Sequence, residues 1–227
     1  MIKTTIPAML TAAVVTLAFT TSADAQRRPH PQFPDMTFFM TSKSEPDGAN
    51  FGGIEGADNH CKALATRAGA GNKEWRAYLS TQATDDKPAI NARDRIGKGP
   101  WVNAVGVEVA ANVEELHSAN SKINVEIGRA ENGRRIPSRL YVVNQHDILT
   151  GSTAEGMAYP PGEDMTCGNW TKNGADGKAR VGHHDRMSGR PGPAGKSWNS
   201  AHNSRGCSAA LLKRSGGAEL LYCFAVK

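Results

Sequence analysis

Four cysteines are distributed unevenly along this chain of 227 residues, and they constrain its fold more than any other feature. Cys61 stands alone, whereas Cys167, Cys207 and Cys223 lie toward the C-terminal end. An even number of cysteines behind an export signal is typical of a disulfide framework, because disulfides form and persist in oxidising compartments. Four cysteines allow three pairings, and their number leaves all three open.

The first 25 residues have the pattern of a secretory signal peptide. Lys3 supplies a positive charge, residues 6–19 form an apolar run, and Ala23-Asp24-Ala25 is a small-x-small cleavage site. The apolar run is too short, and too quickly followed by polar residues, to be a convincing membrane span. We therefore expect residues 1–25 to be a signal peptide, and the protein to be secreted or periplasmic with no membrane span.

The rest of the chain is predicted to form one domain, because roughly 200 residues suit a single hydrophobic core. Residues 26–35 contain three prolines and are expected to be a flexible lead-in to a domain at 36–227. The net charge of +5 would favour an acidic polymer as a partner, but mild basicity is also common in exported proteins and by itself indicates no ligand. No run of five or six Lys or Arg residues occurs, which argues against a nucleic-acid partner.

Hydrophobic patterning predicts an α+β domain. Strands are expected at residues 36–42, 75–80, 139–143 and 218–225, with extended chain at 101–109. Apolar residues from Ala57 to Ala68 recur with helical spacing, and shorter helical segments are expected at 89–96 and 113–117. Residues 150–206 are rich in Gly, Asn, Ser, Asp and Pro, which predicts a long functional or mobile loop.

Several motifs recur in the order found in a known family. The stretch GGIEGADNHC at 52–61, followed by Trp75-Arg76-Ala77-Tyr78-Leu79-Ser80, resembles the opening half of the endostatin domain of collagen. Segments around the three later cysteines are also similar, whereas residues 85–135 show no match. The resemblance implies an exported C-type lectin-like domain. Such a domain has a small, mixed, mostly antiparallel sheet, one or two helices and a long disulfide-clamped loop.

The same resemblance implies nested disulfides, Cys61–Cys223 and Cys167–Cys207. The first would join the predicted helix to the last strand, and the second would close the polar loop. In the chain-entropy account, loops of these lengths stabilise the fold by roughly 5 and 4 kcal/mol. Both values are large against a typical unfolding free energy of about 5–15 kcal/mol.

The resemblance to sugar-binding C-type lectins is incomplete at the calcium site. Those lectins hold calcium partly through Trp-Asn-Asp, and this chain has Trp198-Asn199-Ser200 in the matching place. Serine removes a carboxylate, and calcium usually takes two or more carboxylates. We therefore do not expect calcium-dependent sugar binding here.

The candidate ligand-binding residues of the predicted loop are His184, Asp185, Trp198, Asn199 and His202. One interpretation is that they form a site for a sugar or another polar ligand, or for a metal. The alternative is that these polar groups satisfy the backbone of a long irregular loop. The ligand spacings typical of zinc motifs are absent, so neither a metal nor a cofactor is expected.

Sequence motifs do not indicate an enzyme. The chain lacks GxSxG, HExxH, CxxC and P-loop sequences, and its cysteines are better suited to disulfides than to nucleophilic catalysis. We expect a non-catalytic recognition domain that binds a glycan or another polar surface polymer through the loop between Cys167 and Cys207. The alternative is a protein-binding or structural module of the cell envelope without affinity for sugars.

Overall fold

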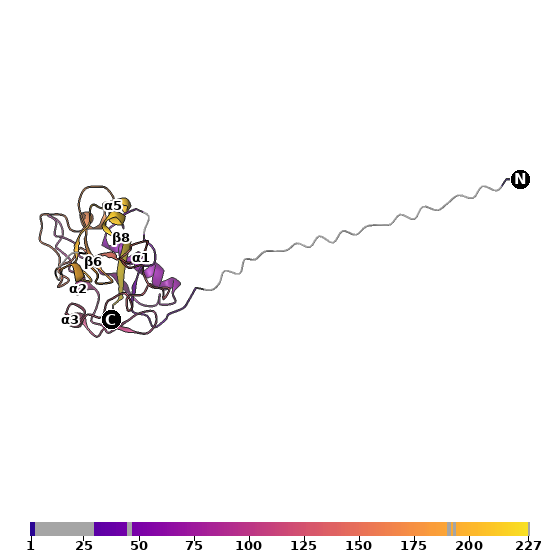
Figure 1. Cartoon of the computed structure of the whole chain (residues 1–227), viewed down its shortest axis with the longest axis horizontal. Helices are drawn as coiled ribbons and strands as arrows, with labels where there is room; N and C mark the ends of the chain where they lie inside the picture. The colour runs from indigo at the N-terminus through magenta and orange to yellow at the C-terminus, as the bar shows by residue number, and fades with distance from the viewer. Residues whose placement is uncertain (3–29, 45–46, 190–191, 193, 227) are drawn as a thin grey trace.

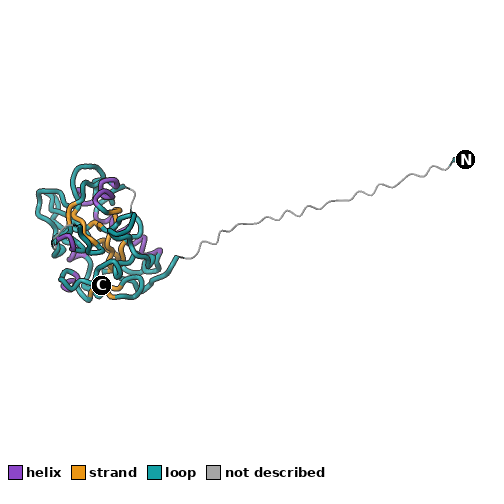
Figure 2. The backbone as a smooth tube through the Cα atoms, viewed as in Figure 1, coloured by secondary structure: helices purple, strands orange, loops and turns teal. Residues whose placement is uncertain are grey.

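The computed structural model describes residues 1–2, 30–44, 47–189, 192 and 194–226 (Figure 1). The predicted signal peptide, apart from residues 1–2, and residues 26–29 of the predicted lead-in lie outside the described residues. Among the described helices, none is long and apolar enough to cross a membrane. Much of the domain is loop, and the strands form a compact group inside it (Figure 2).

The last strand, β8 (Gly217–Ala225), is the centre of a six-stranded sheet of order β1-β8-β5-β6-β7, in which β2 also pairs with β8. Strands β1 (Phe38–Met40) and β2 (Trp75–Ala77) both pair antiparallel with its C-terminal part. Its N-terminal part pairs in parallel with β5 (Asp147–Leu149). The structure thus confirms an α+β domain with a mostly antiparallel sheet.

Two strands extend the sheet beyond β5. β6 (Arg180–His183) pairs antiparallel with β5, and β7 (His202–Asn203) pairs antiparallel with β6. Both lie within residues 150–206, where the sequence predicted a long loop. That region lacks the alternation of apolar residues that marks a half-buried strand, so its short strands were missed.

Side chains of β8 enter two hydrophobic clusters, as expected for a strand whose successive residues point to opposite faces. Leu221, Cys223 and Ala225 belong to a cluster that includes both disulfides. Leu220, Tyr222 and Phe224 belong to the other, whose aromatic members include Phe38, Tyr78, Trp101 and Trp198. The sheet is therefore covered on both faces, which explains why β8 is almost continuously buried.

Helix α1 (Ile54–Arg67) confirms the main predicted helix, and it contacts β2 and β8. The shorter predicted segments also occur, as α2 (Ala92–Arg95) and α3 (Val113–Leu116). The expected extended segment is a hairpin of β3 (Trp101–Val102) and β4 (Glu108–Ala110).

The predicted strand at 139–143 is wrong. These residues form turns and bends, and the side chains of Leu140 and Val142 are 78% and 106% exposed. The run of apolar residues predicted a buried strand, but the strand that pairs with β8 is β5, which begins only at Asp147. The apolar segment 140–143 is instead left on the surface.

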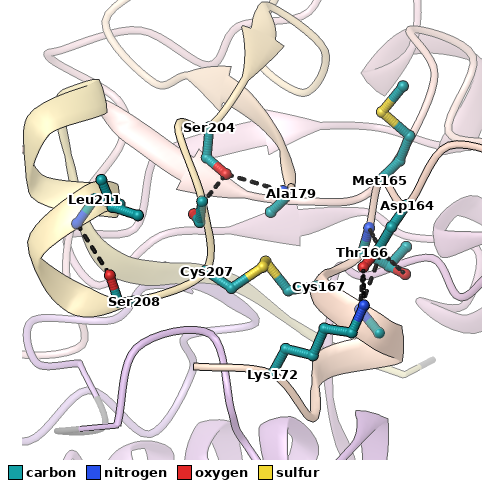
Figure 3. Close-up of a disulfide and its surroundings, with 12 residues drawn as sticks. Asp164, Met165, Thr166, Cys167, Lys172, Ala179, Ser204, Cys207, Ser208 and Leu211 are labelled. Atoms are coloured by element: carbon teal, nitrogen blue, oxygen red, sulfur yellow. Dashed lines mark hydrogen bonds and ion pairs between the residues drawn. A yellow bond between two sulfur atoms is a disulfide. The ribbon is translucent and has the colours of Figure 1, made fainter. Parts of the chain in front are cut away.

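Both disulfides implied by the resemblance are present. Cys61–Cys223 joins α1 to β8, with Cα atoms 5.7 Å apart. Cys167–Cys207 joins the single turn α4 (Cys167–Trp170) to the segment that precedes α5 (Ala209–Ser215) (Figure 3). Two disulfides are consistent with an exported protein.

The turn α4 is left-handed and depends on its neighbours. All four of its residues have positive φ angles, between 49° and 69°. Such a conformation is unfavourable for non-glycine residues. The disulfide fixes Cys167, and Asp164 accepts hydrogen bonds from the backbone N–H groups of Thr166 and Gly168 (Figure 3). Trp170 closes the turn by donating from its indole Nε1 to the Ser80 carbonyl at 2.9 Å.

We predict that Asp58→Ala strongly destabilises the fold. The buried Asp58 carboxylate on α1 accepts hydrogen bonds from Arg76 and Arg95 at 2.7–3.0 Å, and from the backbone N–H of Ala77 at 2.8 Å. Removing it leaves the largely buried Arg95 without this partner, so the free energy of unfolding should fall by about 3–5 kcal/mol. Urea denaturation with the disulfides intact measures this change.

The matched control for Asp58 is Glu126→Gln, because Glu126 forms an exposed ion pair with Arg135. Exposed pairs contribute about 0–1 kcal/mol, so this variant should unfold almost like the wild type. Equal effects of the two substitutions would contradict the role assigned to Asp58.

Candidate functional site

Three histidines and an aspartate converge where β5, β6 and β7 lie side by side. His146 immediately precedes β5 and Asp147 begins it, whereas His183 ends β6 and His202 begins β7. Asp147 lies directly opposite His183 in the register of β5 and β6. The rings of His146 and His183 stack with their centroids 4.1 Å apart. We call these four residues the histidine cluster.

The three imidazoles of the histidine cluster face one carboxylate oxygen. Asp147 Oδ1 lies 3.2 Å from Nε2 of His146, 3.3 Å from Nε2 of His183 and 3.4 Å from Nε2 of His202. Asp147 is only 2% exposed, and His202 is the most accessible of the four. Neither Asp147 oxygen has a hydrogen-bond partner among the described residues.

The opposite nitrogen of each imidazole contacts an oxygen. Nδ1 of His183 lies 2.6 Å from the Gly195 carbonyl, and Nδ1 of His202 lies 3.0 Å from the Asn203 carbonyl. Nδ1 of His146 lies 3.2 Å from Asp185 Oδ1. Backbone carbonyls only accept hydrogen bonds, so Nδ1 of His183 and of His202 carries a proton, and Asp185 can accept one from Nδ1 of His146. A neutral imidazole then presents a bare lone pair at Nε2.

Charge inside the cluster shifts two pKa values. Burial by itself would raise the pKa of the Asp147 carboxyl, but the facing imidazoles of His183 and His202 outweigh it and hold this pKa below its ordinary value. Burial would lower the pKa of His202, but the Asp147 carboxylate outweighs it and raises this pKa. The carboxylate is therefore ionised at neutral pH and attracts a positive charge.

Asp185 contacts the histidine cluster through Nδ1 of His146, on the side of the ring away from Asp147. Its buried carboxylate accepts hydrogen bonds from the backbone N–H groups of Arg139 at 2.8 Å and Met187 at 2.9 Å, in addition to its contact with His146. Burial would raise the pKa of Asp185, but these hydrogen bonds lower it to about 2. Asp185 thus fixes the orientation of the His146 ring.

Close packing of a loop against β6 positions two of the histidines. A Cβ atom on Gly182 would lie 1.8 Å from the carbonyl oxygen of Trp198, so only glycine allows this approach. The approach lets the backbone N–H of His183 donate to the Ser197 carbonyl at 2.9 Å, and that of Ala201 to the Val181 carbonyl at 2.7 Å. These bonds place His183 and His202 on adjacent strands.

An open pocket of about 800 Å³ lies against the cluster, and His146, His183 and His202 line it. Its other polar lining residues include Arg139, Asn144, Ser188, Asn203, Arg205 and Ser215. None of the described lining residues is an aspartate or a glutamate. The wall of the pocket is therefore polar and cationic.

The structure separates the five residues that the sequence suggested as a ligand site. His202 lines the pocket, and Asp185 lies behind it and contacts His146. His184 is fully buried, does not line the pocket, and has its pKa lowered to about 4 by burial.

Trp198 and Asn199 are core residues. Trp198 is 3% exposed and donates from Nε1 to the Leu116 carbonyl at 3.0 Å. Asn199 is 1% exposed and donates from Nδ2 to the Tyr78 hydroxyl and to the carbonyls of Thr153 and Ala154. Neither side chain offers a face to a sugar ring. Their hydrogen bonds, to Leu116 from Trp198 and to Tyr78, Thr153 and Ala154 from Asn199, anchor the loop to the rest of the domain.

Sequence reasoning missed His146, Asp147 and His183. A signal was present, because His146-Asp147 comes directly before the apolar Ile148-Leu149, and His183 follows Val181-Gly182. Polar residues at the ends of neighbouring strands can meet at one edge of a sheet. The strands themselves were not predicted, so the convergence could not be inferred.

No family model matches the chain, and a search of curated proteins found no match. Function must therefore be argued from the geometry and chemistry of the site.

We predict that Asn199→Ala lowers the free energy of unfolding by about 1–3 kcal/mol, because it removes a buried amide that donates to the Tyr78 hydroxyl and to the carbonyls of Thr153 and Ala154. Thermal or urea denaturation measures the loss. Asn120→Ala is the control, since Asn120 is exposed and its replacement should change stability by less than about 0.5 kcal/mol. An Asn199→Ala protein as stable as the control would show that the side chain is free for a ligand.

Proposed function

We propose that this protein is an exported, non-catalytic recognition domain that binds an acidic glycan or a similar anionic surface polymer in the open pocket. The observation that carries the proposal is the charge of the pocket wall. The wall carries the guanidinium groups of Arg139 and Arg205, and no described lining residue is acidic. A cationic concave surface raises the local concentration of anionic ligands.

The position of the pocket also supports a recognition role. Most of the residues that line it lie between Cys167 and Cys207 and are carried by β6, β7 or the chain that joins them. Loops held by a rigid scaffold are common places for binding sites. The Cys167–Cys207 disulfide, at the base of this region, limits how far the segment can move (Figure 3).

The C-type lectin-like character suggested by the motifs is part of the same proposal. Both implied disulfides and a mixed, mostly antiparallel sheet with α1 packed beside it support it. The ligand site would differ from that of calcium-dependent lectins, because Trp198 and Asn199 are buried and Ser200 provides no carboxylate. Recognition would use the side chains of Arg139 and Arg205 in place of the usual calcium ligands.

We predict that the protein binds carboxylate-bearing oligosaccharides, such as hyaluronate oligomers, in preference to neutral dextran oligomers. Calorimetry or a glycan array measures this preference. Arg205→Ala and Arg139→Ala should each weaken binding several-fold, and added salt should weaken it further, because the attraction is electrostatic. Arg134→Ala is the matched control, since Arg134 is exposed and does not line the pocket. Equal binding of neutral and acidic oligomers would overturn the proposal.

A second candidate function is a protein-binding module of the cell envelope, and one observation favours it. Leu140, Tyr141, Val142 and Val143 are consecutive and between 54% and 106% exposed. Four adjacent exposed apolar side chains are unusual on a protein that acts alone, and larger exposed apolar patches mark interaction sites.

We predict for this second function that a photoreactive cross-linker at position 142 yields one defined protein adduct in the envelope. The double replacement of Tyr141 and Val142 by serine should abolish partner binding and leave oligosaccharide binding unchanged. A variant with the cross-linker at the exposed Val105 serves as the control. Adducts that are equally diverse from both positions would contradict the second function.

A further inference from the structure

We propose that His146, Asp147, His183 and His202 bind a divalent transition-metal ion of the zinc type. The sequence analysis expected no metal, because the local spacings typical of zinc motifs are absent. The structure brings the ligands together from three strands. The inference stands on the histidine cluster itself and does not depend on the anionic ligand proposed for the pocket.

The first argument concerns unpaired electron pairs. With each Nδ1 directed at an oxygen, a neutral imidazole carries its proton there and has none at Nε2 to donate to Asp147. Three nitrogen lone pairs would then face an anionic oxygen, an arrangement that is repulsive unless a cation lies among them. Apart from the Nε2–Oδ1 contacts within the cluster itself, Nε2 of His183 and both oxygens of Asp147 are buried without a hydrogen-bond partner among the described residues. Buried polar groups are nearly always paired, so these atoms indicate a ligand.

The second argument concerns distances. A tetrahedral zinc ion with bonds of about 2.0–2.1 Å holds its ligand atoms about 3.3–3.4 Å apart. The three nitrogen-to-Oδ1 distances are 3.2, 3.3 and 3.4 Å. Ligand atoms of His146, Asp147 and His183 also lie within 4.8 Å of one another. These three residues form the core of the site, and His202, which lies outside this group but faces Asp147 Oδ1 at 3.4 Å, would be a fourth ligand from the pocket side.

The third argument concerns the outer contacts of the ligands. Histidines that bind metals almost always donate their other N–H to a carboxylate or a backbone carbonyl, which fixes the tautomer and the ring. His146 has Asp185 in this role, and His183 and His202 have backbone carbonyls. All three histidines therefore have the contacts of metal ligands.

The donor set selects the class of ion. Calcium and magnesium prefer sites made of oxygen atoms. Three imidazole nitrogens and one carboxylate suit zinc and related first-row ions. A ligand set with a single carboxylate and three neutral imidazoles would give a site of net charge +1 with a divalent ion.

A proton on one imidazole is the competing explanation. A protonated His202 would form an ion pair with Asp147 and would account for one of the three contacts. It would leave Nε2 of His183 and Nε2 of His146 still facing the carboxylate. A metal ion accounts for all three contacts at once, and metal titration separates the two explanations.

The test is a zinc titration of the purified protein after dialysis against a chelator. Calorimetry in the presence of a competing chelator should show one ion per chain, and bound zinc should raise the melting temperature. His183→Ala and His202→Ala should each weaken zinc binding by at least about 100-fold, because each removes a direct ligand. Asp185→Asn should weaken it about 10–100-fold, because it alters only the contact that holds His146. Cobalt in place of zinc should give the visible absorption of a four-coordinate ion.

The matched control is His30→Ala, since His30 is an exposed histidine of the lead-in and lies outside the cluster. It should bind zinc like the wild type. Circular dichroism and non-reducing mass analysis establish that each variant is folded with both disulfides, and His202→Ala is the safest variant because His202 is partly exposed. The proposal would be overturned if the folded wild-type protein bound no zinc at micromolar concentrations. It would also be overturned if His30→Ala abolished zinc binding while His183→Ala and His202→Ala did not. Because no oligosaccharide is present, this outcome would leave the proposed recognition of acidic glycans untouched.

Discussion

The pairing of β8 with strands on both of its edges is the interaction on which the rest of the structure depends. β8 is the last strand in sequence, yet it pairs with β1, β2 and β5. Its side chains belong to both hydrophobic clusters. The Cys61–Cys223 disulfide fastens it to α1, so the first helix and the last strand cannot separate. Most contacts here join residues distant in sequence, whose ordering costs loop entropy. A covalent link at this point offsets part of that cost.

The histidine cluster follows from the same pairing. β5 lies parallel to β8, and β6 and β7 are added in turn to its free edge. This order brings residues 146, 147, 183 and 202 to one place although they are spread over 57 positions of the sequence. Gly182 permits the close approach that the last step requires. The site is thus a consequence of sheet order, and no single segment contains it.

This origin explains how much could be predicted from the sequence. α1, β1, β2 and β8 carry local periodicity or apolar runs, and their existence was predicted, as were the disulfides from the family resemblance. β5, β6 and β7 are short and contain polar residues, so no apolar alternation marks them as strands. The apolar run at 139–143 misled for the opposite reason, because local hydrophobicity does not say whether a partner strand exists. His202 and Asp185 were singled out as polar loop residues, but their partners His146, Asp147 and His183 could be found only after the strands were paired.

The proposed metal site and the proposed glycan site are linked by the charge of Asp147, which lies beside the pocket. Without a metal ion, the ionised Asp147 lies beside the pocket, and its negative charge opposes an anionic ligand. A divalent ion bound by the cluster would offset the charge of Asp147, and Arg139 and Arg205 on the wall would then act in the same direction. Metal loading would therefore strengthen the recognition of acidic polymers without any change in shape. The arginines would still favour anions in the metal-free protein, so the two properties are coupled through electrostatics and remain separable by experiment.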